Sequence, residues 1–95
     1  MSDEGYPEPV EELVHDTRDM HRATTSLMKE LESVGWYNKR VDSCKDDDLR
    51  EIFALNRDEG KEHAAMVLEW IRKKDPSFDK ELQDSLCEEE SIAHE

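Results

Sequence analysis

The stretch that decides the fold runs from residue 49 to residue 74 and reads LREIFALNRDEGKEHAAMVLEWIRKK. Its apolar residues return every three or four positions, which is the spacing of one face of an α-helix. Two rows follow this spacing: Leu49, Ile52, Asn56, Glu59, His63, Met66 and Trp70, and beside it Leu49, Phe53, Asn56, Gly60, His63, Val67, Trp70 and Lys74. Polar residues therefore occupy the middle of a face that a helix normally keeps apolar.

His63 is the most informative of these polar residues, because it belongs to both rows. A buried ionisable side chain costs free energy unless a partner or a metal ion holds it. The simplest interpretation is a polar core residue that is hydrogen-bonded to Asn56, Glu59 or a partner chain. The alternative is a metal site, because Asn56 and Glu59 would add oxygen donors to the imidazole.

A second periodic segment precedes this stretch. Its residues alternate in steps of three and four, which is heptad spacing: Val10, Leu13, Thr17, Met20, Thr24, Leu27, Leu31 and Val34. We expect a helix from Pro9 to Val41, since proline is well tolerated in a first helical turn. Gly35 is a position where the helix could end, but the aromatic pair Trp36 and Tyr37 just after it favours continuation.

The segments between and after these helices carry turn signals. Asp46 or Asp47 is suited to capping the second helix, which should end before Pro76. Ser77 is the expected cap of a short third helix that carries Phe78, Leu82 and Leu86 on one face. We therefore expect one domain with a flexible leader, three helices and an acidic tail: residues 1–8, 9–41, 47–75, 77–88 and 89–95.

The predicted fold class is all-α, with a two-helix antiparallel hairpin and a short C-terminal helix. A single hairpin has an apolar face with nothing to cover it, and a chain of 95 residues buries little surface unaided. We expect an obligate homo-oligomer, most simply a dimer in which two hairpins complete a four-helix bundle.

Composition narrows the range of partners. The chain has 26 acidic and 13 basic residues and a formal net charge of −13, which argues against nucleic acid and anionic membrane surfaces. Two cysteines make no disulfide framework, and no apolar run approaches the roughly 20 residues that a membrane helix needs. We expect a cytoplasmic protein. An acidic adaptor that binds a basic protein is a further alternative.

Three residues of the first helix add to the candidate site. Glu30 lies beside Leu31 within reach of the apolar row, although a solvated charged face with Glu32 is the simpler interpretation. Carboxylates with an imidazole suit iron or manganese better than a structural zinc ion. Trp36 and Tyr37 are expected to pack near the hairpin turn or a neighbouring subunit, and a phenol beside a redox metal can also supply a hydrogen bond or an electron.

The chain resembles the encapsulated ferritins, small ferritin-like proteins of bacteria and archaea that act with encapsulin shells. The resemblance covers roughly residues 10–86, and it rests on residues 20–23 (MHRA), 28–40 (MKELESVGWYNKR), 56–66 (NRDEGKEHAAM) and 68–70 (LEW). It implies a two-helix protomer, dimers that form a four-helix bundle, and assembly into a ring-shaped decamer.

The resemblance also implies a di-iron site between two protomers, where Fe²⁺ is oxidised to Fe³⁺ by oxygen for iron storage or detoxification. The family's ligand from the first helix falls on Glu30, and the histidine of its Glu-x-x-His pair falls on His63. Carboxylates on the path of iron to the site fall on Lys29 and Glu32, near Trp36. The tyrosine beside the site falls on Tyr37.

The sequence departs from this family pattern at the metal site. The glutamate of the Glu-x-x-His pair falls on Gly60, and Lys29 replaces a carboxylate with a positive charge. We expect Glu59, one turn before His63, to rotate in as a metal ligand in place of residue 60. The alternative is a degenerate family member, weak or inactive in oxidation, with a structural or regulatory role.

The C-terminal segment also departs from the pattern. A short Gly/Ser/Leu-type peptide that targets the family to encapsulin is not visible in residues 91–95. We expect the protein in the cytoplasm, inside an encapsulin compartment if the resemblance extends to that partner.

Overall fold

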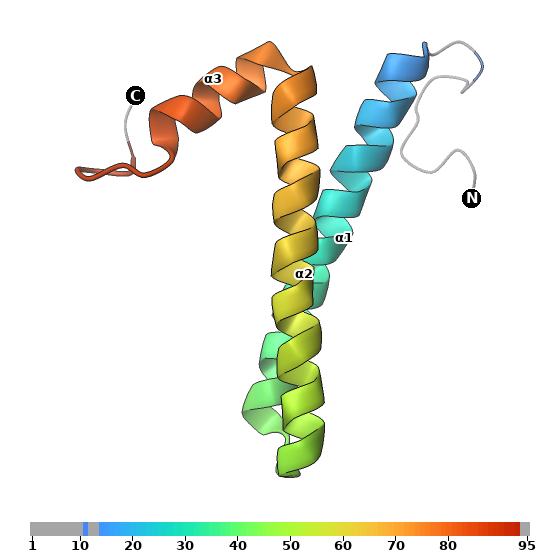
Figure 1. The fold of residues 1–95 in the computed structure, drawn as a ribbon, viewed down its shortest axis with the longest axis vertical. Coiled ribbons are helices and arrows are strands. Elements are labelled where there is room, and N and C mark those ends of the chain that lie inside the picture. The colour runs from blue at the N-terminus through green and yellow to red at the C-terminus, as the bar shows by residue number, and fades with distance from the viewer. Residues whose placement is uncertain (1–10, 12–13, 94–95) are drawn as a thin grey trace.

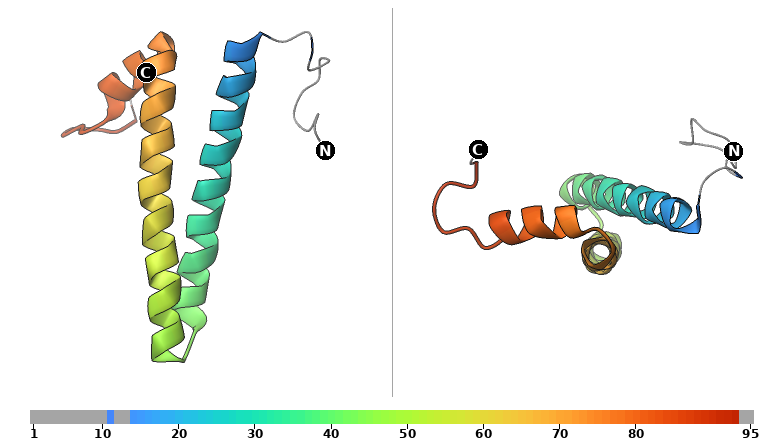
Figure 2. Two further views of the ribbon diagram at one scale, coloured as in Figure 1. Left: turned by 45° about the vertical axis from the view of Figure 1, so that its right-hand side comes forward. Right: turned by 90° about the horizontal axis from the view of Figure 1, so that it is seen from above.

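A computed structural model describes residue 11 and residues 14–93 as an all-helical chain. Its elements are α1 (His15–Ser43), α2 (Asp47–Lys74) and α3 (Pro76–Ser85). Figure 1 shows α1 and α2 as an antiparallel hairpin, while α3 turns away from it. The helices lie side by side near their turn and diverge toward the other end (Figure 2). The all-α hairpin with a short third helix is therefore confirmed. None of these helices is long and apolar enough to cross a membrane.

The bounds of α1 differ from the expected helix at both ends. Val14 has extended backbone angles, so α1 begins at His15, whereas the expected start at Pro9 and the leader 1–8 lie outside the described residues. The helix continues through Gly35 without a break and ends at Ser43, two residues later than expected. The preference for continuation past Gly35 is thus confirmed.

A short turn with its own polar contacts joins α1 to α2. Asp46 caps α2, because its carboxylate accepts a hydrogen bond from the Leu49 backbone N–H at 2.9 Å. Arg50 reaches back over the turn, and its Nε and Nη2 donate to the Cys44 carbonyl at 3.1 and 3.0 Å. These bonds satisfy backbone groups that both helix ends leave without partners, so they stabilise the reversal of the chain.

Asp75 joins α2 to α3. Its carboxylate accepts hydrogen bonds from the backbone N–H groups of Ser77 and Phe78, both at 3.1 Å, so Asp75 caps α3 and Pro76 is the first helical residue. The expected cap at Ser77 is wrong, because the proline is accommodated at the first helical position, where its missing N–H is not needed. Helix α2 consequently ends at Lys74, and α3 ends at Ser85 rather than at residue 88.

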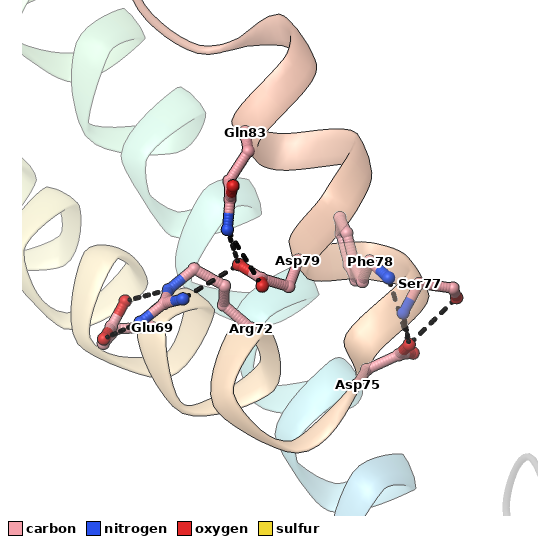
Figure 3. A network of polar contacts seen from close by, with 7 residues as sticks. All are labelled: Glu69, Arg72, Asp75, Ser77, Phe78, Asp79 and Gln83. Carbon is pink, nitrogen blue, oxygen red and sulfur yellow. Dashed lines mark hydrogen bonds and ion pairs between the residues drawn. The ribbon is translucent and has the colours of Figure 1, made fainter.

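An ionic bridge holds α3 at its angle to α2. The guanidinium of Arg72 contacts the carboxylate of Glu69 on its own helix and that of Asp79 on α3, each at 2.8 Å (Figure 3). Gln83 donates to the same Asp79 carboxylate at 3.0 and 3.1 Å. Charge-assisted hydrogen bonds therefore contribute to holding the junction.

The hairpin has almost no core of its own. Within the described helices, the buried residues are Gly60, Ala64 and Ile71, all on α2. Large apolar side chains instead remain exposed on both helices: Met28, Leu31, Trp36, Leu49, Ile52, Leu55, Met66 and Trp70. A chain that leaves this much apolar surface in water needs further surface to cover it.

Gly60 marks a close approach of the two long helices. A Cβ atom at this position would lie 3.1 Å from Val34 Cγ2 and 3.6 Å from Glu30 Oε1. A methyl group at 3.1 Å is tighter than ordinary packing, so the missing side chain lets α1 and α2 meet here. Gly35 differs, because nothing lies within 4 Å of a Cβ built on it.

This contrast predicts opposite results for two equivalent substitutions. Gly35→Ala should raise the free energy of unfolding by about 1 kcal/mol, because alanine favours the helix and meets no neighbour. Gly60→Ala should give a smaller gain or a loss, since Val34 must move. Urea unfolding at one fixed protomer concentration measures both. When Val34 is also replaced by alanine, Gly60→Ala should raise the free energy of unfolding by much of the amount expected for Gly35→Ala. If the effects of Val34→Ala and Gly60→Ala on that free energy are strictly additive, the contact between residues 34 and 60 is contradicted.

The α2–α3 bridge should weaken in acid. Hydrogen bonds from Arg72 hold the pKa of Asp79 below 3.8 and that of Glu69 below 4.5. A lowered folded-state pKa means that the stabilisation is complete above the unfolded pKa and is lost as pH falls through the folded one. We expect hydrogen-exchange protection of α3 to fall, relative to that of α2, as pH drops below about 4.

Two variants test the cause of that loss. Asp79→Asn should lower the protection of α3 already at pH 7, because the charged acceptor of Arg72 is gone. Glu81→Gln removes an exposed carboxylate of the same helix and should leave the protection unchanged. Equal protection of α3 at pH 7 and pH 3 would show that the bridge does not hold it.

Candidate metal site

Glu30 and His63 meet halfway along the hairpin. His63 Nδ1 on α2 lies 3.5 Å from Glu30 Oε2 on α1, and the side chains are 51% and 32% exposed. Because N–H···O hydrogen bonds are usually 2.7–3.2 Å long, this is a loose contact. The fold thus brings two of the expected ligands together and leaves both accessible to a cation or to a second chain.

Gly60 lies next to the Glu30–His63 pair. It is one helical turn before His63, and its missing Cβ would point at the Glu30 carboxylate and Val34. A glutamate at residue 60 would begin beside Glu30, where a third ligand is expected. The orientation of this position therefore agrees with a metal site, but the side chain that would bind the metal is absent.

Glu59 does not take that place within one chain. Its side chain is exposed, and no group of three or more histidine, cysteine or acidic residues close enough to hold a metal occurs among residues 11 and 14–93. The suggestion that Glu59 substitutes for residue 60 therefore stays a prediction that needs a second chain.

The donors of one protomer do not complete an iron site. One carboxylate and one imidazole supply fewer ligands than the three to four protein ligands typical of metal sites in enzymes. Their chemistry does fit iron or manganese, for which mixed oxygen and imidazole ligation is common. Among the described residues of a single chain, this pair therefore supplies two donors that are accessible from the surface.

A partly apolar row surrounds His63 on the exposed side of α2. Its members are Ile52, Leu55, Glu59, His63, Met66 and Trp70, and we call this row the α2 seam. Its large apolar side chains are 36–59% exposed, whereas Gly60, Ala64 and Ile71, each one position further along, are buried. The face of α2 that packs on α1 thus includes Gly60, Ala64 and Ile71, whereas His63 and Trp70, which belong to both rows read from the sequence, face outward.

Glu32, Trp36 and Tyr37 lie together in a shallow groove on α1. The groove is lined by Lys29, Glu32, Ser33, Trp36, Tyr37 and Arg40. Tyr37 packs on Phe53 of α2, with ring centroids 6.0 Å apart. The expected packing of the aromatic pair near the hairpin turn therefore agrees with the structure for Tyr37, while Trp36 remains 59% exposed.

Arg40 is the residue of this region that the sequence interpretation missed. Its guanidinium carbon lies 5.1 Å from the ring centroid of Trp36, 5.6 Å from that of Tyr37 and 5.8 Å from that of Phe53. A signal was present, because an arginine three and four positions after two aromatic residues lies on the same helix face. The third ring comes from α2, and only the fold supplies it.

Two known proteins are similar to this chain in sequence. A ferritin-like protein of Thermotoga maritima is 47% identical over 92 residues, which are 97% of this chain and 80% of that protein. An encapsulated ferritin-like protein of Rhodospirillum rubrum is 49% identical over 85 residues, which are 90% of this chain but only 61% of that relative. The chain therefore spans less than two thirds of the second relative.

A solved structure gives the same result for the fold. The crystal structure of protein ne0167 from Nitrosomonas europaea is 62% identical and superposes with a TM-score of 0.91, covering 95% of this chain and 99% of that one. The family model described as EncFtn-like matches residues 5–89, which is most of the chain. These matches confirm the resemblance to the encapsulated ferritins: the chain belongs to the EncFtn-like family.

Proposed function

We propose that this protein is a ferritin-like iron-binding protein that binds Fe²⁺ between two copies of the chain and oxidises it to Fe³⁺ for storage or detoxification. The observation that carries the proposal is the 3.5 Å contact of Glu30 with His63, whose side chains are both accessible. Iron is the substrate here, and oxygen is the electron acceptor.

The pattern of the α2 seam supports a symmetric dimer. Its apolar residues occupy both ends, and Glu59 and His63 occupy the middle. If two seams pack antiparallel about a twofold axis near position 61, Ile52 packs against the partner's Trp70 and Leu55 against the partner's Met66. The apolar ends then cover each other, which is the surface that a single hairpin lacks.

The same pairing supplies the missing ligands. Glu59 is as far before position 61 as His63 is after it, so Glu59 of one protomer falls opposite the partner's His63. Two protomers then contribute Glu30, His63 and Glu59 twice each, which is enough for two iron ions bridged by carboxylates. In this arrangement Glu59 acts across the interface and replaces the absent side chain of residue 60.

The remaining candidate residues have supporting roles in the proposal. Glu32 and Trp36 would form a path for iron toward the metal site; both line the groove on α1 together with Tyr37, which packs on Phe53 of α2. Tyr37 can supply a hydrogen bond or an electron to bound iron. We also propose assembly of dimers into a ring-shaped decamer and association with an encapsulin shell, supported by the similarity to the encapsulated relative.

One observation favours a second candidate function. Gly60 is buried, and Val34 lies where a side chain at this position would begin. A chain adapted to close packing at residue 60 is consistent with a degenerate member that binds metal weakly and has a structural or regulatory role. Binding and oxidation must therefore be measured separately.

The dimer proposal predicts a mass that depends on the α2 seam. Light scattering across protein concentrations should give at least a dimer, and Met66→Lys should shift the protein toward monomer, because it places a charge in the apolar contact. Met28→Lys is the matched control, since Met28 is 64% exposed and Met66 58%, but Met28 lies outside the seam. A monomer at every concentration would refute the proposal.

The metal proposal predicts that binding and oxidation respond differently to substitution. Anaerobic dialysis should show Fe²⁺ bound to the protein, with Glu30→Gln, Glu59→Gln and His63→Ala each weakening it about tenfold or more, because each variant removes symmetry-related ligands. Glu62→Gln removes a neighbouring exposed carboxylate and should bind as the unmodified protein does. After oxygen is added, ferric absorbance should rise faster than in buffer alone.

Gly60→Glu separates the two candidate functions. It should raise the oxidation rate strongly if residue 60 is the missing ligand, although Val34 must move to admit the side chain. If iron binds but oxidation equals that in buffer, the second candidate function is correct. If neither binding nor oxidation responds to Glu30, His63 or residue 60, the iron-oxidising function fails, and the structural or regulatory role is the candidate that remains.

A further inference from the structure

The groove on α1 holds two cations that have no acidic partner among the described residues. Arg22, Arg50, Arg57 and Arg72 each contact a carboxylate, as expected in a chain with 26 acidic residues. The guanidinium of Arg40 contacts aromatic rings instead, and the ammonium of Lys29 makes no hydrogen bond or ion pair with residues 11 and 14–93. The groove lining thus has two positive charges and one negative charge, that of Glu32, whereas the chain as a whole carries −13.

The guanidinium of Arg40 lies against three aromatic rings. Three rings lie within 6 Å of it, at 5.1, 5.6 and 5.8 Å from their centroids to the guanidinium carbon. Stacking uses the faces of a guanidinium and leaves its N–H edge free to donate hydrogen bonds. No hydrogen bond or ion pair to the described residues occupies this N–H edge, so it is available to an anion.

Helix geometry then limits the shape of the anion. Lys29, Ser33, Trp36 and Arg40 follow one face of α1, but the first and last are eleven residues apart, about 16 Å along the axis. A single tetrahedral or monocarboxylate anion is too short to contact both cations. An anion with charged groups spaced along its length can contact both, with the Ser33 hydroxyl available between them.

We propose that this groove binds a small, elongated polyanion, a di- or tricarboxylate or an oligophosphate, held between Lys29 and Arg40. Nothing in this proposal requires iron, so it is tested on metal-free protein and does not depend on the Glu30–His63 pair. The carboxylate of Glu32 repels such a ligand, whereas it would attract a cation on its way to the metal site. Replacing Glu32 therefore distinguishes anion binding from a path for cations.

The test uses citrate and tripolyphosphate as probes, with inorganic phosphate and acetate as short anions at equal ionic strength. Calorimetric titration of the metal-free protein should show saturable binding of at least one long anion, at least tenfold tighter than either short one. The chain has two tryptophans, so labelling with 5-fluorotryptophan gives one ¹⁹F resonance in the groove and one outside it. The resonance of Trp36 should shift during the titration and that of Trp70 should not.

Substitutions that should change the affinity for the long anion in opposite directions locate the site. Lys29→Gln and Arg40→Gln should each weaken binding of the long anion about tenfold, as expected for loss of a charge-assisted contact. Glu32→Gln should tighten it, because the opposing charge is removed. Lys73→Gln makes the same change in net charge at the far end of the hairpin and should alter the affinity less than twofold. Circular dichroism checks that each variant keeps its helices.

Three results would overturn the proposal. The first is long-anion binding no tighter than that of phosphate and acetate. The second is that both Lys29→Gln and Arg40→Gln bind the long anion with an affinity within twofold of that of the unmodified chain. The third is a shift of the Trp70 resonance while that of Trp36 stays in place. Comparing citrate with tripolyphosphate then decides between carboxylate and phosphate ligands.

Discussion

The close approach of α1 and α2 at Gly60 is the constraint on which the rest of this structure depends. A hairpin of two long, highly charged helices has little apolar surface to bury, and its buried described residues are Gly60, Ala64 and Ile71. The absent side chain at residue 60 lets Val34 and Glu30 lie against the α2 backbone. That contact brings Glu30 within reach of His63, so one packing feature both joins the helices and assembles the candidate ligands.

The same feature also removes a ligand. In a helical metal site, a residue three positions before the histidine lies on the same face and can share its metal ion. Here that position packs on α1 without a side chain, and the ligand set of one protomer is reduced to one carboxylate and one imidazole. In the proposed function, a second protomer both covers the α2 seam and supplies the other ligands. Assembly and metal binding are coupled in the proposed function for this reason.

Charge is distributed unevenly over the fold. Near the α2–α3 junction, acidic groups are matched by Arg72, and at the hairpin turn Asp47 pairs with Arg50. In the groove on α1, Arg40 lies against aromatic rings, whereas Arg22, Arg50, Arg57 and Arg72 contact carboxylates. An acidic chain can therefore present a local site for anions, which its overall net charge of −13 does not suggest.

The sequence by itself determined the helices and the hairpin, because heptad spacing and cap residues act over a few neighbouring positions, and its resemblance to known proteins over residues 20–40 and 56–70 indicated the family. It also predicted which residues, Glu30 and His63, would meet. The sequence did not show which residues of α2 pack on α1 and which face outward. Glu59 and Gly60, for example, are neighbours in the chain and differ in whether α1 covers them. The third ring over Arg40 and the contact of residue 60 with Val34 were likewise decided by the tertiary structure. Each depends on a distance between segments far apart in the chain, which local spacing does not encode.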